Sequence, residues 1–134
     1  MNQESHYVNE KYPESELTGR IIGLAMEVHR TLGNGFQEVI YQRAMAIELK
    51  KNLISFDREQ EITISYKGEP IGSRRADFLI EGKILVELKA ISELEDVHLA
   101  QTINYLEAYG LEIGLLLNFG NKTLQFKRVM KPKS

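Results

Sequence analysis

Two apolar runs separated by a glycine-centred turn constrain the fold of this chain more than any other feature. Residues 74–90 read RRADFLIEGKILVELKA, in which ADFLI and ILVEL have the composition of β-strands and flank Glu81-Gly82-Lys83. Asp77, Glu87 and Lys89 lie in or directly beside these runs. Burying a charge is costly unless it is paired or bound to a metal ion. The segment therefore predicts a β-hairpin whose charged residues have a specific purpose.

The length of the loop decides whether these charges meet. If Glu81-Gly82-Lys83 forms a three-residue loop, Asp77 lies directly opposite Glu87, and opposed residues share one face with Cβ atoms ~5 Å apart. Lys89 shares that face, because residues two apart on a strand point the same way. A loop longer or shorter by one residue would shift the register and place Asp77 on the other side of the sheet.

Converging carboxylates have a limited set of uses. Asp77 and Glu87 would repel each other, and their pKa values would rise unless a cation lay between them. Carboxylate oxygens suit a hard ion such as Mg²⁺ or Mn²⁺, and the chain has no cysteine for a thiolate site. Lys89 beside them could hold an attacking water or stabilise charge on a phosphate. The alternative is a solvated sheet face on which Lys89 simply neutralises the two acids.

Hydrophobic periodicity predicts the remaining elements. Helical spacing of apolar residues is followed by strand-like alternation, and glycines mark the ends of the first and third helices. The expected helices span about 17–32, 36–51 and 93–109, and the expected strands span about 62–66, 76–80, 84–88, 114–119 and 124–129. This order, α-α-β-β-β-α-β-β, predicts a mixed α/β fold with a central mixed sheet flanked by helices. We expect one domain over residues 15–131, a flexible N-terminal tail over 1–14 and a C-terminal tail over 132–134.

Composition and charge indicate the class of protein and its cellular location. The 134 residues are 43% hydrophobic and 27% charged, which is ordinary for a soluble globular domain. The N-terminal residues lack an apolar signal segment and no run approaches the ~20 apolar residues of a membrane span, so we expect a cytoplasmic, prokaryotic-type protein. The net charge of −2 argues against avid non-specific binding of nucleic acid. Basic clusters such as Arg74–Arg75 are most simply solvated faces, and a homodimer could assemble a groove that one chain lacks.

Two helices carry further candidate residues. GFQEVIY at 35–41 places Glu38 and Tyr41 on one helical face, and HLAQTINY at 98–105 aligns three polar side chains. These three are His98, Gln101 and Tyr105. For the tyrosines the simpler reading is an amphipathic core with a hydroxyl near water, and for the histidine it is a surface position. The glutamine lies among apolar neighbours, which suits contact with a phosphate or a metal-bound water. His29 has no partner that the sequence indicates.

Taken in order, these motifs resemble a known family. An Asp followed by E-x-K on the next strand, with a preceding helix Glu and a later helical Q-x-x-x-Y, is similar to the PD-(D/E)XK nuclease superfamily and its RecB-like branch. GFQEVIY, ADFLIEGKILVELKA, HLAQTINYL and GLLLNFG more closely resemble the GxxExxY family over about residues 17–130. One departure is visible, since Arg75-Ala76 stand where the motif's leading proline would be.

The resemblance implies a restriction-endonuclease-like core and a set of roles. Asp77, Glu87, Glu38 and the backbone carbonyl of Leu88 would ligate Mg²⁺ or Mn²⁺, and Lys89 would join Asp77 and Glu87 in catalysis. Residues that orient substrate phosphate or the active-site water would be Gln101, Tyr105, Tyr41 and His98. The implied activity is metal-dependent hydrolysis of phosphodiester bonds in nucleic acid, with DNA favoured over RNA. The alternative is a non-catalytic domain that keeps the fold and binds nucleic acid or a protein.

Overall fold

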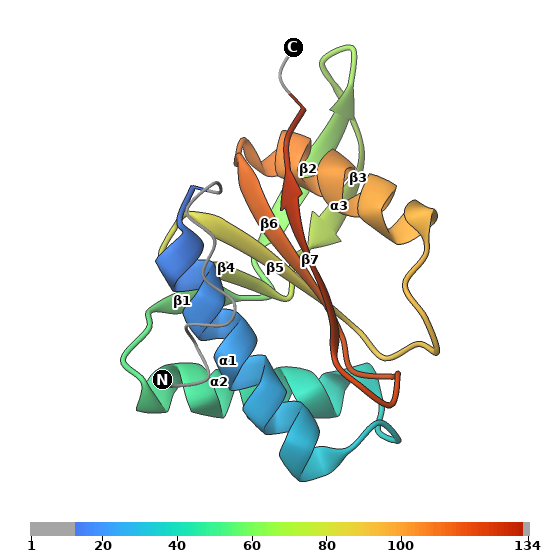
Figure 1. The fold of residues 1–134 in the computed structure, drawn as a ribbon. Coiled ribbons are helices and arrows are strands. Elements are labelled where there is room, and N and C mark those ends of the chain that lie inside the picture. The colour runs from blue at the N-terminus through green and yellow to red at the C-terminus, as the bar shows by residue number, and fades with distance from the viewer. Residues whose placement is uncertain (1–12, 133–134) are drawn as a thin grey trace.

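A computed structural model describes residues 13–132 and shows a β-sheet between two helical layers (Figure 1). Within these residues the helices are α1 (Ser15–Leu32), α2 (Glu38–Lys51) and α3 (Asp96–Tyr109). α1 ends at Gly33 and α3 at Gly110, with φ angles of 76° and 69°, which glycine adopts at little cost. Both glycine stops were predicted and are confirmed. The tails expected at 1–14 and 132–134 lie largely outside the described residues.

The central sheet has five strands in the order β1-β4-β5-β6-β7. Their bounds are β1 (Phe56–Arg58), β4 (Phe78–Ile80), β5 (Ile84–Lys89), β6 (Ile113–Asn118) and β7 (Gln125–Met130). β5 and β6 run parallel, whereas the other neighbouring pairs are antiparallel. Parallel neighbours require a crossover connection, and α3 provides it. Every residue of β6 is buried, which is typical of a continuous apolar strand covered on both faces.

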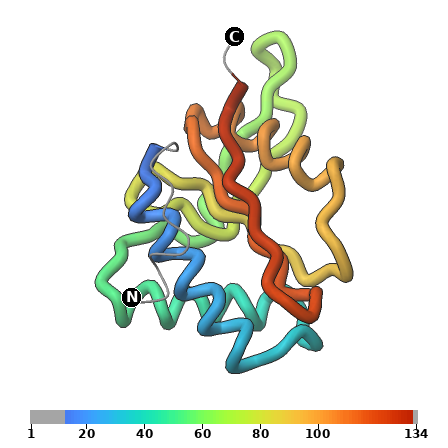
Figure 2. Tube along the Cα trace, in the orientation of Figure 1, coloured from blue at the N-terminus to red at the C-terminus, as the bar shows by residue number. Residues whose placement is uncertain are grey.

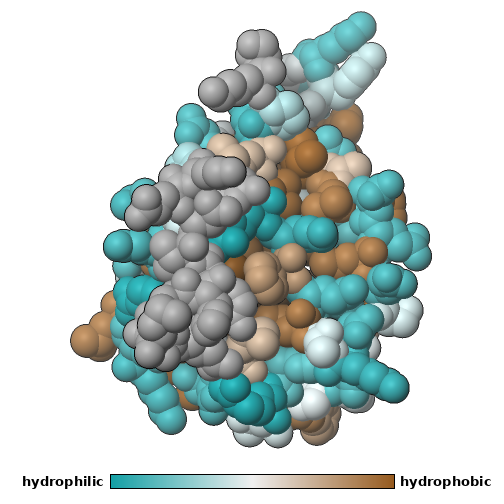
Figure 3. All heavy atoms as spheres, viewed as in Figure 1, coloured by the Kyte–Doolittle hydropathy of each residue, from teal (hydrophilic) through white to brown (hydrophobic). Residues whose placement is uncertain are grey.

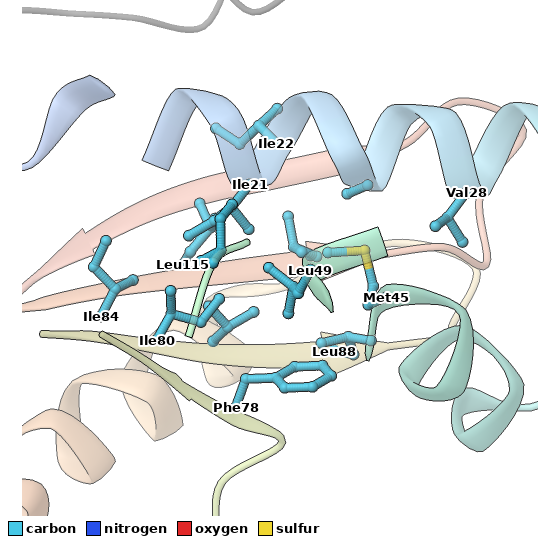
Figure 4. Close-up of a cluster of buried hydrophobic side chains, with 14 of the residues drawn as sticks. Ile21, Ile22, Val28, Met45, Leu49, Phe78, Ile80, Ile84, Leu88 and Leu115 are labelled. Carbon is cyan, nitrogen blue, oxygen red and sulfur yellow. The ribbon is translucent and has the colours of Figure 1, made fainter. Parts of the chain in front are cut away.

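Helices cover both faces of this sheet. α1 and α2 pack on one face, where their apolar side chains meet those of β4, β5 and β6 in the larger core (Figure 4). Ile21, Met45 and Leu115 are fully buried there. α3 packs on the other face against a smaller cluster around Leu85 and Leu106. Successive residues of β5 therefore point alternately into the two cores, and a charged residue on this strand needs a partner in the layer it enters.

A buried asparagine fixes the path of the chain as it leaves β5. The side chain of Asn118 accepts a hydrogen bond from the Ile91 amide at 3.0 Å and donates one to the Ile91 carbonyl at 2.9 Å. Asn121 also donates to the carbonyl of Ser92 at 2.7 Å. In the trace of Figure 2 the segment after β5 accordingly runs close to the turn between β6 and β7. Lys89, the last residue of β5, is thereby held at a defined end of the sheet.

A separate hairpin leads into the segment with the charged residues. β2 (Glu61–Tyr66) and β3 (Glu69–Arg75) form a two-stranded sheet. Its turn residues Lys67 and Gly68 both have positive φ, as in the two-residue turns that suit the twist of a hairpin. At the base, the hydroxyl of Tyr109 accepts a hydrogen bond from the Ala76 amide at 3.0 Å. This contact ties the end of the hairpin to α3, one residue before Asp77.

The predicted fold class is confirmed, but two strands are additional. β1 has only three residues, two of them charged, and β3 reads EPIGSRR, so neither carries a clear apolar alternation. The turn between β2 and β3 is short, because β3 already begins at residue 69. α2 and α3 begin two and three residues later than expected, at Glu38 and Asp96. The start of α3 is set by a capping box between Glu95 and His98, which apolar spacing does not determine.

The surface carries both polar and apolar areas. Hydrophobic side chains gather over the centre of the face on which β7 and α3 lie, with hydrophilic side chains around them (Figure 3). Val97 of α3 is 53% exposed and Met130 of β7 is 37% exposed. Across residues 13–132, no helix combines the length and the hydropathy that crossing a membrane requires.

Candidate functional site

The register of β4 and β5 brings Asp77 to Glu87. Phe78 pairs with Val86 and Ile80 with Ile84, so the loop between the strands has the three residues that this pairing requires. The ladder ends at Phe78, and the side chain of Asp77 continues it, because its Oδ2 accepts a hydrogen bond from the Leu88 amide at 2.8 Å. The three-residue loop and the register expected from the sequence are confirmed. The expected strand over 76–80 is shorter, so Asp77 lies one residue before β4 and not inside it.

Asp77 is held from a second side by α2. Its Oδ1 accepts a hydrogen bond from Nε2 of Gln42 at 2.8 Å, and Oε1 of Gln42 accepts one from Nε of Arg58 at 2.9 Å. Gln42 is only 4% exposed. The sequence analysis missed it, although a glutamine four residues after Glu38 shares the face of that candidate ligand. With both oxygens anchored, the Asp77 carboxylate has a fixed orientation.

Glu87 is a buried carboxylate with one satisfied oxygen. It is 1% exposed, and its Oε2 lies 3.0 Å from Nη2 of Arg74. Its Oε1 is buried and has no hydrogen-bond partner among the described residues. Burial and then the nearby charge of Asp77 raise the pKa of Glu87 to about 8, while Arg74 and Lys89 act in the opposite direction. The site thus holds an acid that retains its proton near neutral pH in the absence of a further cation.

Arg74 belongs to the site, contrary to the sequence-based interpretation. Besides contacting Glu87, its guanidinium lies over the ring of Tyr105, 4.4 Å from the centroid. The solvated face predicted for the Arg74–Arg75 cluster applies to Arg75, which is 65% exposed and pairs with Glu61 at 3.5 Å. For Arg74 that interpretation is wrong. The missing signal was strand β3, since alternation along a strand sends adjacent residues to opposite faces.

Lys89 and Glu38 complete the charged neighbourhood. The Lys89 ammonium lies close enough to lower the pKa of both Glu87 and Glu38. Glu38 is the first residue of α2 and lines a cleft together with Gln42 and Asp77. Although Glu38 is exposed, partial loss of water and the charge of Asp77 raise its pKa. The negative charge of Asp77 therefore acts on the Glu38 carboxyl, which lines the same cleft.

The α3 candidates lie at different distances from these charges. Tyr105 reaches the site through its contact with Arg74. Gln101, one turn earlier, is half-buried, and no hydrogen bond joins it to the carboxylates within residues 13–132. The ring of His98 accepts a hydrogen bond at Nδ1 from the Glu95 amide at 2.9 Å. His98 thus caps the start of α3, a structural use of the side chain that the sequence analysis did not anticipate.

Tyr41 and His29 support the scaffold beside the site. The hydroxyl of Tyr41 donates to the Gly33 carbonyl at 2.6 Å and accepts from the Phe36 amide at 3.1 Å, and its ring stacks on Phe119. Tyr41 is fully buried and fixes the turn that starts α2, and its expected contact with a substrate stays a prediction. His29 gains a partner, since its Nε2 lies 2.9 Å from the Asn121 carbonyl oxygen.

Comparison with known proteins identifies the superfamily of this chain. A sequence profile of the PD-(D/E)XK nuclease superfamily matches residues 15–129. The chain belongs to the PD-(D/E)XK nuclease superfamily. The match spans both the hairpin with Asp77 and Glu87 and the helices on either side. A search of curated proteins finds no match.

Solved structures show the same fold. The crystal structure of SSO0001 is 23% identical with a TM-score of 0.60, and the match covers 72% of this chain and 52% of SSO0001. The chain thus spans about half the length of that protein. An alkaline exonuclease from Laribacter hongkongensis, LHK-Exo, is 11% identical with a TM-score of 0.51, and the match covers 97% of this chain and 75% of that one. At these identities the likeness concerns the fold alone.

PD-(D/E)XK nucleases typically use divalent metal ions, and the donors present fit such an ion. Two anchored carboxylates converge, and Oε1 of Glu87 is buried without a donor. Mg²⁺ is commonly held by one or two carboxylates and completes its shell with water and substrate phosphate. Within residues 13–132 no three acidic or histidine side chains cluster closely enough to hold a metal alone. Asp77 and Glu87 would therefore be the candidate protein donors, and Glu38 lines the same cleft as Asp77.

Proposed function

We propose that this protein is a divalent-metal-dependent nuclease that hydrolyses phosphodiester bonds in nucleic acid, with DNA the favoured substrate. The observation that carries the proposal is the convergence of Asp77 and Glu87 beside Lys89 at the point where β4 leaves β5. The narrower assignment to the GxxExxY family accords with the scaffold, because Tyr41 holds the turn at Gly33–Phe36 from which Glu38 projects.

The backbone supports Leu88 as a further ligand. The Lys89 carbonyl accepts a hydrogen bond from the Phe119 amide, which places the polar groups of Lys89 on the β6 side of the strand. Adjacent residues of a strand direct their backbone groups to opposite sides, so the Leu88 carbonyl faces the β4 side, where Asp77 already binds the Leu88 amide. Asp77, Glu87 and this carbonyl together would present oxygen donors to Mg²⁺ or Mn²⁺.

Each remaining residue has a defined task in this proposal. The bound ion would polarise the phosphate and lower the pKa of a water molecule. Lys89 would hold that water or neutralise charge that develops on the phosphate. Gln101 and Tyr105 on α3 would orient the substrate phosphate, and Glu38 would bind the outer side of the metal through water. No covalent intermediate is needed, because water is the nucleophile.

Matched variants in one hairpin test the proposal. Glu87→Ala and Lys89→Ala should abolish Mg²⁺- or Mn²⁺-dependent cleavage of labelled DNA while the far-UV circular dichroism spectrum is retained. Glu81→Ala and Lys83→Ala change the same residue types in the exposed loop and should leave cleavage unchanged. If the first pair cleaves as the wild type does, the assignment of these residues is wrong.

Binding without cleavage would select the alternative function. Fluorescence anisotropy with labelled single-stranded and duplex DNA in Ca²⁺, set beside cleavage in Mg²⁺ and Mn²⁺, separates the two functions. A domain that binds DNA in Ca²⁺ but cleaves neither form in Mg²⁺ or Mn²⁺ is a non-catalytic binding domain. A parallel series with RNA tests the preference for DNA.

A further inference from the structure

Arg74 is the hydrogen-bond partner of Glu87 in this structure. Its Nη2 lies 3.0 Å from Oε2 of Glu87, and the two side chains are 31% and 2% exposed. A buried carboxylate requires such a partner, because desolvation strongly disfavours a lone charge. The Arg74 guanidinium therefore occupies one of the two oxygens that Glu87 could offer to a metal ion.

This contact opposes the binding of a divalent ion beside it. A cation bound between Asp77 and Glu87 would place two positive charges beside the guanidinium in a site of low polarity, where like charges repel strongly. The Nε of Arg74 is already buried without a hydrogen-bond partner, so the side chain is not fully satisfied where it lies. Oε1 of Glu87 is open to the ion, but a second cation on the same carboxylate weakens the hold of Arg74 on Oε2 through like-charge repulsion.

The position of Arg74 decides where the displaced guanidinium would go. Arg74 lies near the end of β3, three residues before Asp77, and its side chain rests on the ring of Tyr105. Cation–π stacking leaves the edge of a guanidinium free for hydrogen bonds. A small rotation away from Glu87 would keep Arg74 at the mouth of the site. There it can bind a phosphate through two parallel N–H groups.

We propose that Arg74 exchanges with the metal ion on Glu87, holding this carboxylate in the metal-free protein and binding the substrate phosphate once the metal is in place. The inference rests on the proposed function and extends it to a residue outside the family motif. In this proposal Arg74 becomes available to bind phosphate only after metal binding has released it from Glu87.

Nuclear magnetic resonance on the wild-type protein tests the exchange directly. Mg²⁺ should shift the Nε–Hε signal of Arg74 with the same concentration dependence as the amide signal of Leu88, which reports on Asp77. If the Leu88 signal shifts and the Arg74 signal does not, the metal binds and the exchange is refuted. If neither signal shifts, the metal site itself is absent, and the proposed function fails together with the exchange.

Two charge-matched variants supply a second readout. Arg74→Gln should tighten Mn²⁺ binding about tenfold, within the usual range for coupled sites, and weaken binding of a DNA oligonucleotide in Ca²⁺ by a similar factor. Arg75→Gln removes the same charge from the neighbouring residue, which pairs with Glu61 instead, and should change Mn²⁺ affinity by less than about twofold. Weaker binding of both ligands by Arg74→Gln would indicate a merely structural role and overturn the proposal. If Arg74→Gln does not fold, the wild-type titration decides.

Discussion

Replacing Glu87 by glutamine should stabilise the metal-free protein at alkaline pH. Burial and Asp77 raise the pKa of the Glu87 carboxyl from 4.5 to about 8 in the folded protein. Between these values the folded protein keeps a proton that the unfolded chain releases, so the free energy of unfolding falls as the pH rises. The stabilising contribution is fully present below pH 4.5 and is lost by about pH 8. Glutamine does not titrate in this range, and its amide oxygen can still accept a hydrogen bond from Arg74.

The size of the effect follows from the same pKa values. A rise from 4.5 to about 8 corresponds to an upper limit of roughly 5 kcal/mol, at 1.36 kcal/mol for each pKa unit. Buried sites in proteins respond to charge with an effective dielectric constant well above that of dry protein, so we expect about half of this limit. Wild type and Glu87→Gln should therefore differ little at pH 5 and by ~2–3 kcal/mol at pH 8.

Urea denaturation in EDTA, followed by far-UV circular dichroism at pH 5, 6, 7 and 8, measures this difference. Circular dichroism is suitable because the chain contains no tryptophan. Glu38→Gln serves as the control, since Glu38 is exposed and its substitution should flatten the pH dependence less. Wild type and Glu87→Gln curves that remain parallel from pH 5 to 8 would refute the reasoning, because the proton would then belong to another group.

Three further substitutions test the scaffold of the site. Gln42→Ala removes the amide that anchors Asp77. It should lower the free energy of unfolding by about 1–3 kcal/mol, measured with urea, and weaken Mn²⁺ binding, measured by calorimetry. An unchanged Mn²⁺ affinity would show that Asp77 needs no such anchor. Tyr41→Phe leaves two backbone groups without their partner and should lower the free energy of unfolding by about 1–2 kcal/mol, measured with urea; an unchanged stability would show that the turn does not need the hydroxyl. Gly120→Ala should prevent folding or raise the urea sensitivity sharply, because a Cβ there would collide with the backbone of Ile91; a variant as stable as wild type would contradict this packing.

The parts of the site that the sequence predicted depend on local rules. The three-residue loop fixes the register of β4 and β5, and the alternation of a strand then places Asp77, Glu87 and Lys89 together. The glycine stops after α1 and α3 follow from the conformational freedom of that residue. These features required only spacing within one segment, so the sequence was sufficient for them.

The site contacts that the sequence analysis did not predict join segments that lie far apart in the chain. Arg74 and Glu87 are 13 residues apart, and Gln42 and Asp77 are 35 apart; neither pair follows from periodicity. The hydroxyl of Tyr41 could have faced water or substrate on the basis of helical spacing alone, and only its stacking on Phe119 shows that it points inward. Side-chain hydrogen bonds of this kind are decided by tertiary packing.

Glu87 lies where an apolar residue would make a more stable protein. It is 1% exposed in a strand whose neighbours Val86 and Leu88 are fully buried, and replacing a buried ion pair by apolar residues of similar volume is often neutral or stabilising. Asp77 increases the cost by repelling the ionised form, and Arg74 offsets it only in part. Burying Glu87 beside Asp77 and Arg74 therefore does not serve the stability of the sheet. The unfavourable charge becomes useful when a cation enters between the carboxylates, because the same low polarity that raises the pKa of Glu87 then strengthens its attraction for the ion.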